Sequence, residues 1–311
     1  MVFLGTAELA CASLAGLRSA AFTEVVAVVT QPDRPKGRDL KLQASPVKQL
    51  AQRLGLPVLQ PERARSPEFV VQLQALRPDL IVVAAYGQIL PQAILDVPRL
   101  GCVNVHTSLL PKYRGAAPIQ WAILNDESET GVTIMKMDAG LDTGPILMQE
   151  TTLIQPGDDA QSLHDRLAQM GANLLVATLP DYAVGKLAIC AQPAEGASYA
   201  RKIRKEDGRL DWGQPARALW NRIRGFKPWP GAFTFLAVQP QPRLLKIWEA
   251  EVLEGVVGEP GFVLQADKSG LTIGCGSGAL RVRSLQLEGS RRLGVLEFLS
   301  GHPLVPGEKL D

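Results

Sequence analysis

The run L-I-V-V-A-A at residues 80–85 decides the fold. It has no alternation of polar and apolar positions, which is typical of a strand covered on both faces of a sheet. Further strand-like runs occur at residues 1–4, 24–30 and 101–105. Amphipathic stretches that predict helices lie between them, at residues 7–18, 47–54 and 67–76. Strands that alternate with helices predict an α/β fold, with a doubly wound and mainly parallel sheet.

The second half of the chain has a different pattern. Two more strands at residues 131–137 and 146–154, and a long helix at residues 160–183, complete the first half. Short alternating strands separated by Gly and Pro then follow at residues 233–236, 244–253, 261–265, 271–274 and 280–287. This spacing suits a small β-barrel. Because A-Q-P-A-E-G-A-S (191–198) is typical of a linker, we predict a catalytic domain at 1–188, a linker at 189–205 and a barrel domain at 206–311.

Composition excludes several classes of protein. Of the 311 residues, 46% are hydrophobic and 21% are charged, which excludes a disordered chain. The net charge of +2 argues against a strongly basic nucleic-acid binder. Four cysteines without a C-x-x-C pair predict neither a zinc site nor a disulfide framework, and they favour the cytoplasm. We expect no membrane span, because no apolar run approaches the required length.

Polar residues at the end of a predicted strand form the candidate site. Asn104 and His106 stand in N-V-H-T-S-L-L-P (104–111), two positions apart, so their side chains point to the same face of the strand. Ligands of open α/β sheets bind at the carboxyl ends of the strands. The loop D-A-G-L-D-T-G (138–144) adds carboxylates, including Asp142. An amide, an imidazole and a carboxylate together can support acyl transfer.

Each of these residues also has a purely structural interpretation. Asn104 can form a turn and Asp142 can cap a loop, and spacing alone does not bring Asp142 to His106. Other chemistries have weaker support, because the sequence has no G-x-S-x-G elbow, no paired histidines and no G-x-G-x-x-G after the first strand. Acyl-type transfer without a metal is therefore the favoured chemistry.

Two long segments resemble the methionyl-tRNA formyltransferase family. They are N-V-H-T-S-L-L-P-K-Y-R-G-A-A-P-I-Q-W-A-I-L (104–124) and E-T-G-V-T-I-M-K-M-D-A-G-L-D-T-G (129–144). The likeness extends to residues 30–38, 82–91, 199–212 and 226–232. It implies a Rossmann-like formyltransferase domain followed by an OB-like barrel that grips the tRNA body. It also implies a monomeric, metal-independent enzyme that acts in the cytoplasm.

The implied reaction moves the formyl group of 10-formyltetrahydrofolate to the α-amino group of methionine on initiator methionyl-tRNA. The product is N-formylmethionyl-tRNA, which serves translation initiation. By resemblance, Asn104, His106 and Asp142 are the catalytic residues. The implied folate contacts are Ser108, Leu109, Leu110 and Pro111. Residues 86–90 are expected to line the pteridine pocket.

A basic stretch at residues 31–48 follows the second predicted strand, with five cations and two carboxylates. A charged run of this kind is usually only a solvated loop. The resemblance implies that this flexible loop enters the acceptor end of the tRNA. The candidate contacts are Arg34, Lys36, Arg38 and Lys41, with Arg38 the most important.

The sequence departs from the family at its first loop, which reads G-T-A-E-L (5–9) where G-T-P-x-F is usual. Two other functions stay open. The same chemistry can serve another acceptor, such as a sugar nucleotide, glycinamide ribonucleotide or another amine. Alternatively, the chain is a non-catalytic tRNA-binding protein with a degenerate α/β domain, although intact Asn104, His106 and Asp142 argue against this.

Overall fold

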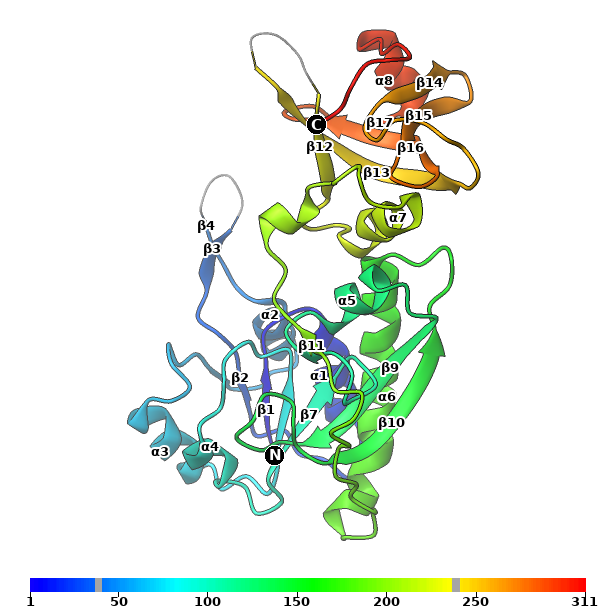
Figure 1. Ribbon diagram of the computed structural model, residues 1–311. Helices are drawn as coiled ribbons and strands as arrows, with labels where there is room; N and C mark the ends of the chain where they lie inside the picture. The colour runs from blue at the N-terminus through cyan, green and yellow to red at the C-terminus, as the bar shows by residue number, and fades with distance from the viewer. Residues whose placement is uncertain (37–40, 237–240) are drawn as a thin grey trace. The chain divides into compact units, whose positions relative to one another are not determined.

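The computed structural model describes residues 1–36, 41–236 and 241–311 (Figure 1). Contacts divide the chain into two compact units. The first unit comprises Met1–Pro118, Glu129–Leu153 and His164–Arg201. The second comprises Ile119–Ser128, Ile154–Leu163 and Lys202–Asp311. The second unit therefore includes two short segments from the first half of the sequence.

A seven-stranded sheet forms the centre of the first unit, in the order β10-β9-β7-β6-β1-β2-β5. Its strands are β1 (Val2–Gly5), β2 (Ala27–Val29), β5 (Val58–Leu59), β6 (Ile81–Ala84), β7 (Cys102–His106), β9 (Glu129–Lys136) and β10 (Ile146–Leu153). The five strands from β5 to β7 pair in parallel, while β9 and β10 pair antiparallel. The predicted mainly parallel sheet is thus confirmed, and the L-I-V-V-A-A run forms its fourth strand.

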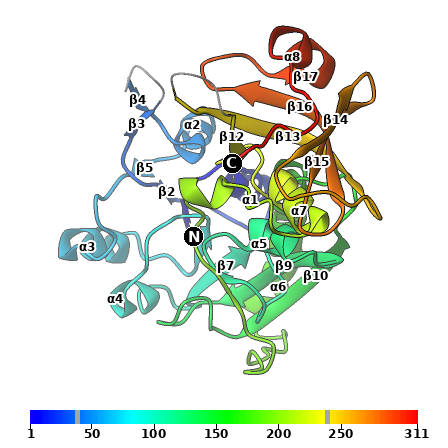
Figure 2. The same ribbon diagram turned by 45° about the horizontal axis from the view of Figure 1, so that its top comes forward.

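Helices cover both faces of this sheet (Figures 1 and 2). They are α1 (Leu9–Ser19), α2 (Pro46–Arg53), α3 (Pro67–Ala75), α4 (Gln92–Leu95) and α6 (Ala160–Ala183). One face packs side chains of α3 and α4, such as Phe69 and Ile94, against alternate strand residues such as Leu4. On β7 and β9, Val105 and Val132 approach Gly171 of α6, so this long helix covers the opposite face.

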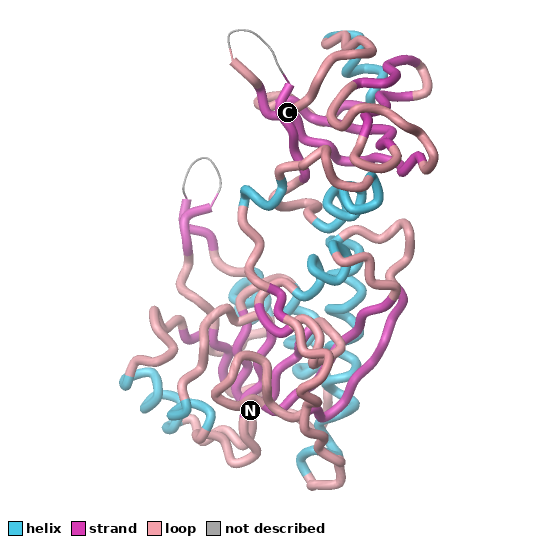
Figure 3. Tube along the Cα trace, viewed as in Figure 1, coloured by secondary structure: helices cyan, strands magenta, loops and turns pink. Residues whose placement is uncertain are grey.

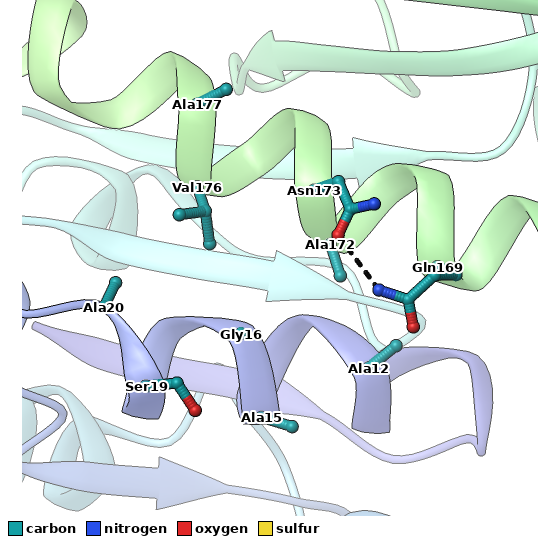
Figure 4. Close-up of a pocket in the computed structure, with 10 residues that line it drawn as sticks. All are labelled: Ala12, Ala15, Gly16, Ser19, Ala20, Gln169, Ala172, Asn173, Val176 and Ala177. Atoms are coloured by element: carbon teal, nitrogen blue, oxygen red, sulfur yellow. Dashed lines mark hydrogen bonds between the residues drawn. The ribbon is translucent and has the colours of Figure 1, made fainter.

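Helix α1 lies beside α6 in the first unit (Figure 4). A cavity of about 570 Å³ between them is lined mainly by small residues. A Cβ on Gly16 of α1 would lie 3.4 Å from a methyl group of Val176, about an ordinary van der Waals distance, so the helices approach closely at this point.

Ser-Pro pairs begin two of the helices. Ser45 accepts a hydrogen bond from the backbone N–H of Lys48 at the start of α2, and Ser66 accepts one from that of Phe69 at the start of α3. The proline that follows each serine suits the first helical position, where an N–H would have no partner within the helix. These signals explain why the sequence predicted both helices to within about a residue.

The basic segment forms a hairpin where the sequence predicted a loop. Strands β3 (Arg34–Lys36) and β4 (Lys41–Gln43) pair antiparallel, and the hairpin projects from the body of the first unit (Figure 3). Pro35 concealed this strand in the sequence, since proline cannot donate a ladder hydrogen bond and is confined to edges. A two-stranded ribbon has only edges, so it accommodates the proline.

An antiparallel sheet forms the main part of the second unit, in the order β12-β13-β16-β15-β14, with β17 beside β16. Its strands are β12 (Ala232–Leu236), β13 (Arg243–Leu253), β14 (Val263–Asp267), β15 (Gly270–Gly274), β16 (Ala279–Leu287) and β17 (Leu293–Gly294). The C-terminal residues pair near both edges, through Leu310 with Leu236 and Lys309 with Phe262. Among the described residues, strand ladders alone do not close the predicted barrel.

The core of the second unit also receives two helices that the sequence pattern did not predict, α7 (Ala216–Gly225) and α8 (Val295–Gly301). A further helix, α5 (Pro118–Leu124), belongs to the same unit. Trp212 is buried in this core and donates a hydrogen bond over 3.0 Å from Nε1 to the Thr234 hydroxyl. Its indole thus has a packing role within the unit.

Candidate active site

Strand β7 positions two of the predicted catalytic residues. It lies between β6 and β9 in the sheet, and Asn104 and His106 occupy alternate positions toward its carboxyl end. Val105 between them faces α6. Because side chains alternate along a strand, Asn104 and His106 point to the other face. The His106 side chain is only 6% exposed.

Asp142 lies in the turn that joins β9 to β10. Its backbone is left-handed, with φ of +54°, and the turn requires glycine beside it. A Cβ on Gly144 would overlap the carbonyl oxygen of Lys136. Asp138 braces the turn by accepting hydrogen bonds from the Gly140 N–H over 3.0 Å and from the Thr143 hydroxyl over 2.8 Å. The turn is therefore shaped by the residues of the D-A-G-L-D-T-G motif itself.

The three predicted catalytic side chains meet at the carboxyl end of β7. The Asp142 carboxylate accepts a hydrogen bond from the backbone N–H of Gly115 over 2.8 Å and one from Asn104 Nδ2 over 3.4 Å. Its Oδ2 lies 3.8 Å from Nδ1 of His106. On the other side of the ring, His106 Nε2 lies 2.9 Å from the carbonyl oxygen of Tyr113. The structure thus brings residues 104 and 142 together across thirty-eight positions.

His106 stands between two hydrogen-bond acceptors. A carbonyl oxygen cannot donate, so Nε2 carries the hydrogen in its contact with Tyr113. Nδ1 then faces the Asp142 carboxylate at a distance too long for a direct hydrogen bond. A proton that arrives at Nδ1 would lie beside the Asp142 carboxylate. The arrangement is suited to proton transfer through Nδ1.

The predicted folate segment comprises Ser108, Leu109, Leu110 and Pro111. Ser108 and Leu110 are buried, and their polar groups bind within the protein. The Ser108 hydroxyl donates over 2.7 Å to a backbone carbonyl four residues on, and the Leu110 N–H donates over 3.1 Å to Thr133. Leu109 and Pro111 are half-buried and so offer some surface to a ligand. Hydrogen bonds within the protein thus fix the Ser108 hydroxyl and the Leu110 N–H.

The stretch at residues 86–90, which is predicted to line the pteridine pocket, has both buried and exposed side chains. The side chains of Tyr86 and Leu90 lie in the hydrophobic core, and burial raises the pKa of the Tyr86 phenol to about 12. Ile89 is 82% exposed. The Tyr86 carbonyl accepts hydrogen bonds from the Thr6 hydroxyl over 2.8 Å and from the Gln31 amide over 2.9 Å. This stretch thus ties together the loops that follow β1, β2 and β6.

The predicted tRNA contacts are Arg34, Lys36, Arg38 and Lys41. Arg34 is exposed on the β3–β4 hairpin, and its guanidinium donates over 3.0 Å to Gln31. Lys36 and Lys41 occupy paired positions of the hairpin strands. Arg38 lies outside the described residues. Three of the four predicted contacts therefore belong to one hairpin.

A fifth cation of the basic segment, Lys48, has a structural role. Its ammonium donates over 2.7 Å both to the carboxylate of Asp33 and to the side-chain oxygen of Gln60. The hydrogen bond from Lys48 lowers the pKa of Asp33. These contacts join α2 to the residues just before the hairpin. Lys48 and Asp33 thus neutralise each other within the first unit.

Sequence reasoning missed the backbone groups that complete the site. Gly115 and Tyr113 act through their N–H and C=O groups, which carry no signal in a list of side chains. Gly115 belongs to β8 (Arg114–Gly115), which pairs in parallel with β11 (Tyr199–Ala200). A Cβ on Gly115 would lie 2.8 Å from the Ala200 carbonyl oxygen, so glycine is required there.

Two family models match the chain. The model described as formyl transferase matches residues 1–179, and the one described as formyl transferase, C-terminal domain, matches residues 202–303. The methionyl-tRNA formyltransferase of Geobacter sulfurreducens is 51% identical over 310 residues, covering all of this chain and 96% of its own. That of Caldanaerobacter subterraneus is 51% identical over 308 residues, covering 99% and 98%. The chain belongs to the methionyl-tRNA formyltransferase family.

Solved structures with the same fold include two formyltransferases. The sugar 3N-formyl transferase WlaRD has a TM-score of 0.67 at 20% identity, with 93% of this chain and 98% of that chain covered. The N-formyltransferase of Helicobacter canadensis has a TM-score of 0.65 at 20% identity, with 90% and 98% covered. At this identity the likeness concerns the fold alone, and it supports the formyltransferase fold for the whole chain.

Three further features concern possible metal clusters, membrane-spanning helices and the state of the cysteines. In residues 1–36, 41–236 and 241–311, no three His, Cys, Asp or Glu side chains gather in a way that could hold a metal ion. Over the same part of the chain, no helix has the length and apolar character needed to cross a bilayer. All four cysteines are free thiols.

Proposed function

We propose that the chain transfers the formyl group of 10-formyltetrahydrofolate to the α-amino group of methionine on initiator methionyl-tRNA. The observation that carries this proposal is the meeting of Asn104, His106 and Asp142 at the carboxyl end of β7. Family membership supports formyl-folate as the donor and methionyl-tRNA as the acceptor.

The chemistry requires one bond to form and one to break. The free amine of methionine attacks the formyl carbon, and the carbonyl oxygen gains negative charge in a tetrahedral intermediate. The bond from that carbon to N10 of the folate then breaks. One proton leaves the amine and one reaches the folate nitrogen, so the site must both take up and return a proton.

Asn104 is the donor proposed for the developing oxyanion. Its Nδ2 group makes only a long hydrogen bond to Asp142, at 3.4 Å, so it can turn to a better acceptor at small cost. A preorganised donor of this kind typically lowers the barrier by about 2.7–4 kcal/mol. His106 Nδ1 and the Asp142 carboxylate are proposed to carry the proton from the amine to the folate nitrogen.

The tRNA is proposed to approach along the β3–β4 hairpin. Arg34, Lys36, Arg38 and Lys41 would contact phosphates, which position a nucleic acid without reading its sequence. Residues 206–311 are proposed to hold the tRNA body. We further propose that the protein acts as a monomer in the cytoplasm, where charged initiator tRNA is consumed.

The test presents the purified chain with 10-formyltetrahydrofolate and one of three acceptors. These are methionyl initiator tRNA, the same tRNA without its amino acid, and a nucleotide-linked amino sugar. Mass spectrometry of the products is expected to find a formyl group only on the methionine of the charged tRNA. Formylation of the amino sugar instead would overturn the proposal, and tRNA binding without any formyl transfer would favour a non-catalytic protein.

A further inference from the structure

The segment predicted as a linker is built into the active site. Cys190 pairs through both backbone groups with Ile146 at the start of β10. Two residues later, the side-chain amide of Gln192 donates to the carbonyl oxygen of Asp142 over 2.8 Å and to that of Gly144 over 2.7 Å. One side chain from outside the turn thus holds the backbone at its left-handed residue and two residues further on. Neither family model includes residues 180–201, where Cys190 and Gln192 lie.

The side-chain oxygen of Gln192 binds the second loop of the site, which contains Arg114 and Gly115. Arg114 donates to Gln192 Oε1 from Nε over 3.0 Å and from Nη2 over 2.7 Å. The next residue, Gly115, supplies the N–H that binds the Asp142 carboxylate. Further along the segment, the Ser198 hydroxyl accepts a hydrogen bond over 2.9 Å from the N–H of Tyr113. The linker segment therefore fixes both loops that contact the catalytic side chains.

The orientation of the Gln192 amide follows from its partners. The Arg114 guanidinium can only donate, so it must face the amide oxygen. The two carbonyls can only accept, so they must face the amide nitrogen. Glutamate has the same shape as glutamine, but its ionised carboxylate only accepts hydrogen bonds. Glutamine meets both requirements, because its amide oxygen accepts and its amide nitrogen carries two hydrogens to donate.

We propose that Gln192 is a positioning residue that sets the place of Asp142 relative to His106 and Asn104. This inference rests on the proposed function, because it takes Asp142 as a participant in formyl transfer. Displacement of a reacting group by about 1 Å can cost about 100-fold in rate. Gln192 makes no hydrogen bond to the catalytic side chains themselves in the described structure, so its effect on the reaction must pass through the turn.

The test variant is Gln192→Glu, which keeps the size and shape of the side chain. Its carboxylate would place a negative oxygen against the carbonyls of Asp142 and Gly144, with no hydrogen to donate. We expect kcat to fall by about 10- to 100-fold, with KM for both substrates nearly unchanged. The matched control is Gln74→Glu on the exposed face of α3, which should keep wild-type kinetics.

A double-mutant cycle separates positioning from general damage to the fold. If Gln192 acts only through Asp142, then Gln192→Glu should slow the Asp142→Asn enzyme by less than about threefold, since coupled residues are not additive. A full additional loss in that background would overturn the proposal. So would a folded Gln192→Glu enzyme with unchanged kcat, or one in which only a KM rises.

Protonation of the Gln192→Glu variant supplies a second readout. Once protonated, the introduced carboxyl group again has a hydrogen to donate to a carbonyl, so the ratio of variant to wild-type rate should rise as the pH is lowered. A ratio that stays constant with pH counts against the proposal. If Gln192→Glu does not fold, Gln192→Leu replaces it in the same cycle. Because wild-type formylation is measured first, its absence would reject the proposed function, whereas failure of the variants alone would reject the role of Gln192.

Discussion

Replacing Asp142 with asparagine removes the negative charge at the centre of the site and changes almost nothing in shape. If the new amide keeps its oxygen toward the Gly115 N–H, its NH₂ group faces the NH₂ group of Asn104, where two donors meet. A buried polar group left without a partner costs about 1–3 kcal/mol. Domains are stable by about 5–15 kcal/mol, so we expect the variant to fold.

The effect on catalysis should be larger than the effect on folding. The Asp142 carboxylate lies 3.8 Å from His106 Nδ1, and both side chains are at most 15% exposed. Proton transfer by a positioned side chain typically contributes about 100- to 10,000-fold to a rate. Without the carboxylate at this distance from His106, the barrier should rise by about 3–4 kcal/mol. The rate should therefore fall by about 100- to 1000-fold.

The assay measures initial rates of formyl-methionyl-tRNA formation at saturating concentrations of both substrates, with thermal unfolding as the check on folding. Asp138→Asn is the matched control, because it alters an exposed carboxylate of the same turn and keeps an oxygen for Gly140 and Thr143. It should stay close to the wild-type rate. A folded Asp142→Asn enzyme that keeps more than about a tenth of wild-type kcat would remove Asp142 from the mechanism.

Three further predictions follow from other parts of the molecule. Arg38→Leu should raise KM for charged tRNA and reduce the salt dependence of its binding, while folate affinity stays constant; equal loss of both would place Arg38 in the catalytic pocket. Cys190 is exposed, so it should be the first cysteine to react with a maleimide. Burial raises the pKa of the Cys102 thiol to about 12 and that of Cys275 to about 11, so both thiols should react only when the protein unfolds. Peptide mapping of the labelled protein would show this order. Gly144→Ala should destabilise the turn and lower the melting temperature, and an unchanged melting curve would contradict the overlap that the backbone predicts.

The sequence predicted the sheet and two residues of the candidate site because these depend on local patterns. The uninterrupted aliphatic residues of β6 indicate a buried strand, and the pattern of residues 160–183 indicates a long helix. Both patterns can be recognised within a short stretch of sequence, and the structure confirms both elements. Asn104 and His106 were found together because they alternate on one strand. Asp142 needed the family resemblance, since no local rule connects a turn to a strand end thirty-six positions earlier.

The missed features depend on contacts between distant segments. Gln192 lies in a stretch rich in Ala, Pro and Gly, and its composition is that of a linker. Its partners are two carbonyls and an arginine from loops far away in sequence. Tyr86 likewise has contacts that its motif does not show, because its ring lies in the core and its carbonyl oxygen joins separate loops. Local composition reports only which residues are adjacent in sequence. The roles of Gln192 and Tyr86 depend on contacts with residues that are distant in sequence and close in the folded structure.

The most direct test of the central claim follows the formyl carbon itself. 10-Formyltetrahydrofolate carrying an isotopic label in its formyl group is mixed with the protein and methionyl initiator tRNA, and the label is located by mass spectrometry. We predict that the label appears on the α-nitrogen of methionine, in an amount equal to the tetrahydrofolate released. Label that appears as free formate, with the methionine amine unmodified, would contradict direct transfer at the site of Asn104, His106 and Asp142.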